Sequence, residues 1–259
     1  YTRTHIENII RKHSSYGIRR IHKTLKQRGI DIGRDTLGTL LKLWGLSLRR
    51  KTKPRTRSVI DHILAFLSDR SNLLAKMKLT APLQAVTSDI TELWYANGTR
   101  KCYLAVHKDA YGQCVYGWSI DARMETALVL RSFTRAVRYL KQNVGALPKD
   151  IVFHQDRGSQ YTSYAYVDMV LRVGTLSYSS PGTPTDNGGQ ESFFGRFKDE
   201  WRAEISELQD IRKVERFIRS KIQYYNHHRL HTSIGYQTPF AFTKSVLVEW
   251  GNWFSESRT

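Results

Sequence analysis

The chain has 259 residues, 40% of them hydrophobic and 12% aromatic, which allows one large or two to three small domains and argues against a disordered chain. Its two cysteines, Cys102 and Cys114, argue against a disulfide scaffold, and the lack of a CxxC pair argues against a structural zinc site. No apolar run approaches the ~20 residues that span a bilayer, so we expect no membrane partner.

The net charge of +18 is unevenly distributed. Residues 1–58 hold 16 of the 41 lysines and arginines but 3 of the 23 acidic residues, which leaves a net charge of +13 in that segment. Positive charge of this density favours a polyanion through counterion release, and nucleic acid is the favoured partner. The alternative is an ordinary basic surface. An anionic membrane surface is disfavoured because the segment lacks a broad apolar face.

The first 48 residues are predicted to form three short helices, a helix-turn-helix-like DNA-binding domain. The apolar positions with helical spacing are Ile6, Ile9 and Ile10, then Ile18, Ile21 and Leu25, then Leu37, Leu40, Leu41 and Trp44. Ser14 and Ser15 are N-cap candidates for the second helix. The third helix is the candidate for the major groove, through Arg34 or Lys42. A plain helical bundle is the open alternative.

Residues 49–80 are predicted to be a basic linker followed by a helix over 59–78. The segment 49–57 carries six positive charges in nine residues together with a proline, so we expect it not to pack. Such an arm tracks phosphates or enters a minor groove without a base code of its own. The candidate DNA contacts are Arg49, Arg50, Lys51, Lys53, Arg55 and Arg57.

The pattern of residues 81–203 changes to that of an α/β domain. Strands predicted at 83–91, 101–107 and 113–120 are separated by short gaps, which is typical of an antiparallel meander. The elements that follow are a helix at 124–140, a strand at 151–153, a helix at 163–172, a strand at 175–178 and a helix at 190–203. This order predicts a mixed five-stranded sheet with flanking helices.

Residues 204–259 are predicted to be a helical C-terminal tail, with one long helix whose apolar stripe runs from Leu208 to Tyr225. The neighbouring His227, His228 and His231 suggest a metal site. No cysteine or acid stands at ligand spacing, so we expect hydrogen-bonding or DNA-facing roles for these histidines.

Three carboxylates stand where a sheet can gather them. Asp89 is expected to end the first strand, Asp156 follows the fourth, and Glu191 opens a helix. Hard oxygen ligands of this kind suit Mg²⁺ or Mn²⁺, and two such ions can activate a water or hydroxyl and stabilise a leaving oxygen. Lys198 lies two helical turns after Glu191, on the same face, where it can hold a DNA phosphate. The alternative is a turn cap, a helix-dipole acid and a solvated lysine.

Motifs along nearly the whole chain carry a family resemblance. They are Tyr16-Gly17-Ile18-Arg19-Arg20-Ile21, Asp89-Ile90-Thr91, Asp109, Gly117-Trp118, His154-Gln155-Asp156-Arg157-Gly158-Ser159-Gln160-Tyr161, Asp186-Asn187, Glu191-Ser192-Phe193-Phe194, Lys198, Tyr225-Asn226 through His231, and Thr238-Pro239. In these motifs and their order the chain resembles the catalytic protein of IS3-family insertion-sequence transposases, which are relatives of retroviral integrases.

The resemblance implies an RNase H-like catalytic domain with a DDE triad formed by Asp89, Asp156 and Glu191, which would bind two Mg²⁺ or Mn²⁺ ions. In such enzymes, metal-dependent cleavage frees a 3′-hydroxyl at the element end, and this hydroxyl attacks a target phosphodiester without a covalent protein–DNA intermediate. The chain departs from the family in two places: the 34 residues between Asp156 and Glu191 are one fewer than usual, and Gln155 replaces a serine. Neither change removes a ligand.

The sequence therefore predicts a DNA transposase that acts on double-stranded DNA as a homo-oligomer, in the cytoplasm of a prokaryote and associated with its nucleoid. His154 and Asn187 are candidate active-site neighbours, with a packing role as the alternative for His154. Arg157 and Tyr161 are candidates to shape the DNA channel. Family members also carry an upstream helix-turn-helix and leucine zipper, so we expect end recognition and oligomerisation to be incomplete with this sequence alone. The rival functions are a non-catalytic DNA-binding protein and a nuclease without strand transfer.

Overall fold

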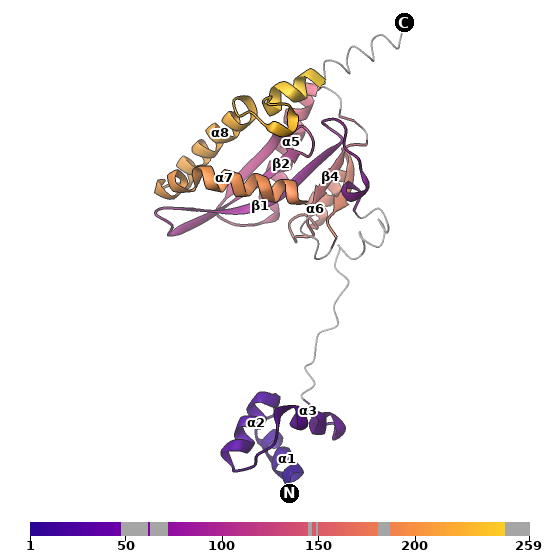
Figure 1. Cartoon of the computed structure of the whole chain (residues 1–259), viewed down its shortest axis with the longest axis vertical. Helices are drawn as coiled ribbons and strands as arrows, with labels where there is room; N and C mark the ends of the chain where they lie inside the picture. Colours follow the sequence, from indigo (N-terminus) through magenta and orange to yellow (C-terminus); the bar gives the residue numbers. More distant parts are fainter. Residues whose placement is uncertain (48–61, 63–71, 145–146, 149, 181–186, 247–259) are drawn as a thin grey trace. The chain divides into compact units, whose positions relative to one another are not determined.

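The computed structural model describes residues 1–47, 62, 72–144, 147–148, 150–180 and 187–246 (Figure 1). The chain divides into two compact units, Tyr1–Thr56 and Arg57–Thr259, and each is described by itself. Among the described residues, no helix combines the length and apolarity needed to cross a bilayer.

The first unit contains three helices, α1 (Thr2–Lys12), α2 (Ile18–Gln27) and α3 (Arg34–Leu43). They bury a small core that consists of Ile6, Ile9, Ile21, Leu25, Leu37 and Leu41. The predicted helices are therefore present, but the predicted cap of α2 is wrong. Gly17, in an extended conformation, precedes the helix, and no side chain caps it, because the two candidate serines stand too far upstream of Ile18.

The second unit is built on one five-stranded sheet. Its strands are β1 (Ala85–Tyr95), β2 (Arg100–Asp109), β3 (Val115–Asp121), β4 (Val152–Gln155) and β5 (Thr175–Tyr178). The strand order is β3-β2-β1-β4-β5. The β1–β2 and β2–β3 pairs are antiparallel, whereas β1–β4 and β4–β5 are parallel. The mixed five-stranded sheet predicted from the sequence is confirmed.

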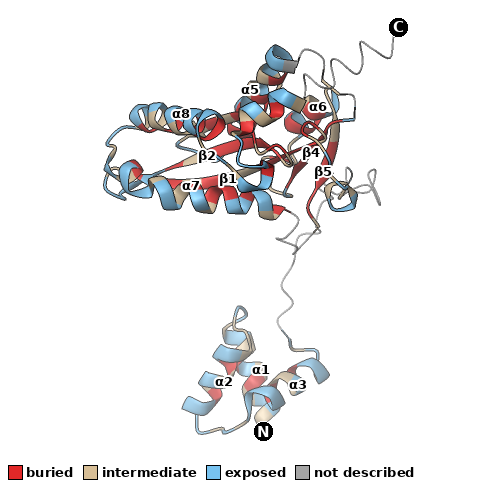
Figure 2. Ribbon diagram, turned by 45° about the horizontal axis from the view of Figure 1, so that its top comes forward, coloured by how far each residue is buried: buried red, intermediate tan, exposed pale blue. Residues whose placement is uncertain are grey.

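Helices cover both faces of this sheet, and its strands are largely buried (Figure 2). The helices are α5 (Thr126–Val144), α6 (Tyr164–Leu171), α7 (Gly188–Glu207) and α8 (Ile211–His227). Alternation along β2 separates two cores: Ala105 packs with α5 and α6, whereas Leu104 and Val106 pack with α7 and α8. Short 3₁₀ helices lie at Leu74–Lys76 and Thr232–Ile234.

Two predicted element boundaries are corrected by the structure. Strand β1 continues six residues beyond Asp89, because Leu93 and Tyr95 are buried against α7 and α8 and the strand pairs with β2 as far as Tyr95. The helix predicted over 59–78 falls mostly outside the described residues. Its described end, from residue 72, contains only the short 3₁₀ helix, whose backbone binds the Ser177 hydroxyl.

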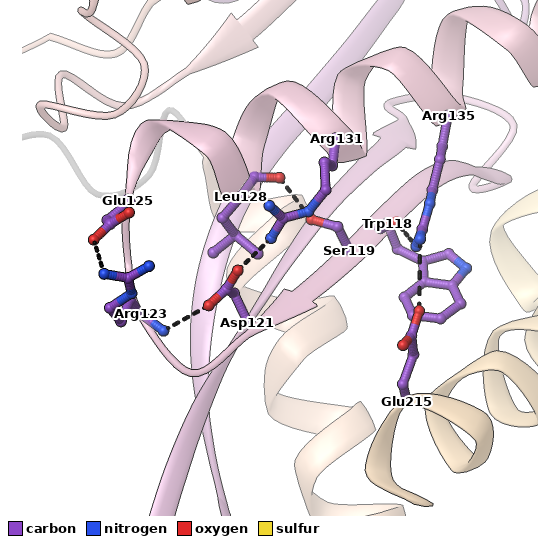
Figure 3. Close-up of polar contacts among 9 residues, drawn as sticks. All are labelled: Trp118, Ser119, Asp121, Arg123, Glu125, Leu128, Arg131, Arg135 and Glu215. Atoms are coloured by element: carbon purple, nitrogen blue, oxygen red, sulfur yellow. Dashed lines mark hydrogen bonds and ion pairs between the residues drawn. The ribbon is translucent and has the colours of Figure 1, made fainter. Parts of the chain in front are cut away.

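Helix α5 is joined to strand β3 by a row of polar contacts (Figure 3). These are Ser119 Oγ to the Leu128 carbonyl at 2.6 Å, Arg131 to Asp121 at 2.5 Å, and Arg135 to the Trp118 carbonyl at 2.9 Å. Gly117 marks the closest approach of the two elements: a Cβ there would lie 2.3 Å from the Ser132 carbonyl oxygen and 2.4 Å from the Ala136 nitrogen. Only glycine therefore allows α5 to lie this near the strand.

The exposed edge of the sheet at β3 is held by a side chain from α8. Asn226 is buried, and its amide both accepts a hydrogen bond from the Val115 backbone nitrogen and donates one to the Val115 carbonyl, each at 2.9 Å. A side-chain amide thus takes the place of a neighbouring strand at this point. The same two bonds fix the C-terminal end of α8 against the sheet.

Candidate active site

The parallel pairing of β1 with β4 places two of the candidate carboxylates side by side. The last register pair of these strands is Ser88 with Gln155. Asp89 follows Ser88, and Asp156 follows Gln155. Neighbouring strands lie about 4.8 Å apart. Asp89 is half-buried and stands in the middle of β1, whereas Asp156 is exposed just beyond the end of β4. The prediction that Asp89 ends its strand is therefore wrong, but the strand pairing still places Asp89 next to Asp156.

Glu191 is brought toward this pair by the first turn of α7, which lies along β1 (Figure 1). Two hydrogen bonds tie that turn to β1 immediately before Asp89. Thr87 Oγ1 donates to Gln190 Oε1 at 3.1 Å, and Asn187 Nδ2 donates to the Ser88 carbonyl at 3.4 Å. The helix that carries the third carboxylate is thus anchored to the strand that carries the first.

The charges of these groups act on one another through Asp89. The pKa of Asp89 is raised to about 6, mainly by burial and also by the charges of Asp156 and Glu191. A hydrogen bond from the Ile90 backbone nitrogen and the charge of Lys198 act in the opposite direction. Asp156, Glu191 and Lys198 therefore all lie within electrostatic reach of Asp89. A carboxyl group whose charged form is disfavoured in this way is one that a bound cation would stabilise.

The donor set fits a divalent ion in its chemistry, since it consists of three hard carboxylate oxygens. Within the described part of the chain, however, no three His, Cys, Asp or Glu side chains are already drawn together at ligand spacing. Carboxylates that converge without a cation repel one another, so a bound ion would be needed to hold all three together. Glu191 is exposed, and Asp156 is exposed with its Oδ1 accepting a hydrogen bond from the Gly158 backbone nitrogen at 3.0 Å.

Asp89→Asn is expected to make the metal-free protein more stable at neutral pH. The folded-state pKa of about 6 exceeds the ordinary 3.8, so between these values the native state binds more protons than the unfolded state, and stability falls as pH rises through that window. The uncharged amide removes this penalty and should raise the free energy of unfolding by roughly 1–3 kcal/mol at pH 7. Urea unfolding in EDTA checks this. Equal stability of the two proteins at neutral pH would contradict the raised pKa.

Two predicted neighbours of the active site turn out to lie inside the protein. His154 is fully buried, with Nδ1 2.8 Å from Ser177 Oγ and Nε2 3.1 Å from Ser179 Oγ, which supports the packing alternative. Tyr161 is 1% exposed, and its hydroxyl lies 2.8 Å from Ser88 Oγ. Tyr161 therefore cannot shape a DNA channel by direct contact; its hydroxyl instead supports β1 at Ser88, one residue before Asp89.

The remaining candidates differ in how they are placed. Asn187 is nearly buried at the start of α7, and Lys198 is half-buried two turns after Glu191. Arg157 is the residue after Asp156. It donates from Nε to the Ser179 carbonyl at 3.0 Å, and this bond holds its guanidinium in place. In the first unit Arg34 and Lys42 are exposed on α3. The six basic candidates of the segment 49–57 lie outside the described residues.

The three histidines of the tail lie in separate surroundings. His227 packs against Phe240, His228 stacks on Tyr224, and His231 meets Tyr225 edge to face. Sequence reasoning missed Thr87, two residues before Asp89, and Gln190, directly before Glu191, although both are polar residues close to a candidate carboxylate. That placement is a signal that sequence can give.

A mixed sheet in this strand order, with helices on both faces and acidic residues on β1, just beyond β4 and on α7, defines an RNase H-like domain. Two family models described as an integrase core domain match the chain, one over residues 80–184 and the other over residues 174–239.

Two relatives of this chain are described as transposases of insertion sequences. The transposase for insertion sequence element IS904 of Lactococcus lactis subsp. lactis (strain IL1403) is 32% identical, over 92% of this chain and 92% of the relative. A putative transposase for insertion sequence element IS986/IS6110 of Mycobacterium tuberculosis is 29% identical, over 88% of this chain and 83% of the relative. The chain therefore belongs to the insertion-sequence transposases of the integrase superfamily, as its motifs predicted.

Among solved structures, a simian T-cell lymphotropic virus intasome in complex with PP2A regulatory subunit B56 gamma shares the fold. The TM-score is 0.53 at 15% identity, over 92% of this chain and 74% of that chain. This likeness extends to the fold alone.

Proposed function

We propose that this chain is a DNA transposase that cleaves DNA at transposon ends and joins the freed 3′-hydroxyl to target DNA. The observation that carries the proposal is the juxtaposition of Asp89 and Asp156 on adjacent parallel strands, with Glu191 tied to the same place by α7. Membership of the insertion-sequence transposases supports the same reaction. Joining forms one P–O bond and breaks another, so it needs no outside energy source.

The three carboxylates would hold two Mg²⁺ or Mn²⁺ ions. When bound, such ions supply an activated water or hydroxyl on one side of the phosphodiester and stabilise the leaving oxygen on the other. The chain's own part is to fix the geometry. Strand pairing sets the Asp89–Asp156 separation, and the bonds of Thr87 and Asn187 set the start of α7. Lys198 would hold a DNA phosphate near the carboxylates, and Arg157 would contact the DNA beside Asp156.

The proposed partners are double-stranded DNA, as both transposon end and target, and further copies of this chain. The exposed Arg34 and Lys42 of α3 would contact DNA from the first unit, together with the basic segment 49–57. The high positive charge supports such binding. The place of action would be the nucleoid of a bacterial cell, since the named relatives are bacterial.

A joining assay distinguishes the proposal from its two rivals. Labelled oligonucleotides with the DNA sequence that flanks the gene are incubated with a supercoiled plasmid and Mg²⁺ or Mn²⁺, with the full-length product of the element as the enzyme. Label joined to plasmid supports a strand-transferring transposase. Cleavage without joining would favour a nuclease, and binding without cleavage would favour a non-catalytic DNA-binding protein; either result would overturn the proposal.

A further inference from the structure

A groove lies between α7 and α8, and its lining runs from Gly189 and Ser192, on either side of Glu191, to residues further along both helices. Its enclosed volume is about 40 Å³, which is room for roughly three water molecules. The lining side chains used below are Arg196, Trp201, Lys221, Tyr224, Arg229 and His231. Arg196 follows Glu191 by five residues, so it points roughly 140° away from it around the helix. Arg196 therefore lies on a different face of α7 from Glu191.

The walls of this groove are held in place by contacts of their own. Arg229, just after α8, pairs with Glu200 of α7, with its Nη1 2.5 Å and 2.7 Å from the two carboxylate oxygens. Lys221 of α8 lies over the Trp201 ring of α7, with its Nζ 3.7 Å from the ring centroid. These pairs join the two helices, so the groove exists before any ligand enters it.

The groove also has a net positive charge, since Arg196, Lys221 and Arg229 line it together with one acid, Glu200. Within the described part of the chain, Arg196 is exposed and forms no ion pair. Behind the lining residue Gln113 lies Lys108, a fully buried lysine whose Nζ donates to Gln113 Oε1 at 2.9 Å. Cationic side chains thus lie at the groove on both helices, and Lys108 of β2 lies behind it.

The pKa of His231 is affected by these charges. Its Nε2 is buried and lacks a hydrogen-bond partner within the described residues. Its pKa is lowered to about 4, first by burial and then by the charges of Arg229, Lys108 and Arg196. The part of this shift that comes from neighbouring charges has the sign of a positive field, which favours an anion.

We propose that this groove binds a backbone phosphate of DNA, at a position distinct from the scissile phosphate. Arg196 and Lys221 would contact the phosphate oxygens, as cations do in most protein–DNA interfaces. The exposed Tyr224 at the rim would contact the adjoining sugar or base. The inference rests on the proposed function in one respect, the choice of DNA as the anion. A strand-transferring enzyme must hold an end and a target together, and a second phosphate site serves that need.

The test compares Arg196→Gln and the double variant R196Q/K221Q with Arg216→Gln. Arg216 is exposed on α8 outside the groove lining, so R216Q makes the same change of charge elsewhere. Fluorescence anisotropy with a labelled DNA duplex is measured in EDTA over a series of salt concentrations. The groove variants should weaken binding roughly fivefold or more, and each lost phosphate contact should reduce the salt slope by about 0.9. R216Q should leave the slope nearly unchanged.

Equal slopes for the groove variants and R216Q would overturn the inference, because the loss would then reflect net charge alone. Arg196→Lys keeps the cation and should retain most of the slope, which separates loss of the contact from misfolding. Because EDTA prevents cleavage, the result does not depend on catalysis. Failure of the proposed function would appear instead in the joining assay, where wild-type protein would bind DNA but join none.

Discussion

Glu191→Gln is expected to lower the rates of DNA cleavage and joining on the order of 10³-fold or more, while DNA affinity measured in EDTA changes little. The substitution keeps the size of the side chain but removes the charge that a divalent ion requires. Glu191 is exposed and forms no ion pair within the described residues, so its loss should not unfold the protein. Single-turnover assays on a labelled transposon end measure the rates.

The matched control for this prediction is Glu204→Gln. Glu204 is an exposed acid in the last turn of α7, at the opposite end of the helix from Glu191. The same chemical change there should leave the rates within about twofold. Asp89→Asn and Asp156→Asn should each match the loss of Glu191→Gln, and double variants should be no worse, because groups that act as one unit are not additive. Retained cleavage in Glu191→Gln would remove Glu191 from the site.

Gly117→Ala is expected to destabilise the second unit by about 3 kcal/mol or more. The new Cβ would lie 2.3 Å from one backbone atom of α5 and 2.4 Å from another, so the helix itself must move away from β3. That movement would also strain the contacts that join the two elements in Figure 3. Thermal and urea unfolding, followed by circular dichroism, measure the change.

Gly195→Ala is the control for Gly117→Ala. Gly195 lies inside α7, and apart from its chain neighbours and the backbone of its own helix no heavy atom lies within 4 Å of the position of a Cβ. Alanine there should stabilise the protein by up to about 1 kcal/mol through helix propensity. The two Gly→Ala changes should therefore have opposite signs. Equal small effects would show that the β3–α5 contact tolerates a side chain.

The elements of the sheet could be predicted from the sequence because each has a local signal. The strand at 175–178 was predicted with the bounds it has in the structure, and the helices were found within a few residues. The first strand is predicted to end too early, at Asp89, because an acid is a common residue at the end of a strand. The alternation continues beyond it, with Leu93 and Tyr95 buried and Trp94 exposed between them.

The features that depend on distant pairings could not be derived from the residues by local reasoning. The neighbourhood of Asp89 and Asp156 arises from parallel pairing of strands far apart in the chain. The family resemblance named these residues, but their register comes only from the structure. The burial of His154 and Tyr161 likewise depends on β5 and β1 lying beside them. The groove with Arg196 exists only because α8 lies against α7.

The measurement that tests the central claim most directly is a calorimetric titration of Mn²⁺ into the protein bound to a transposon end that lacks the reactive 3′-hydroxyl. If Asp89, Asp156 and Glu191 form one site, wild-type protein binds two ions. Asp89→Asn, Asp156→Asn and Glu191→Gln should each weaken binding at least about tenfold, whereas Glu204→Gln should not. An unchanged titration in the three carboxylate variants would show that these residues do not hold the metal, and the proposed mechanism would fail.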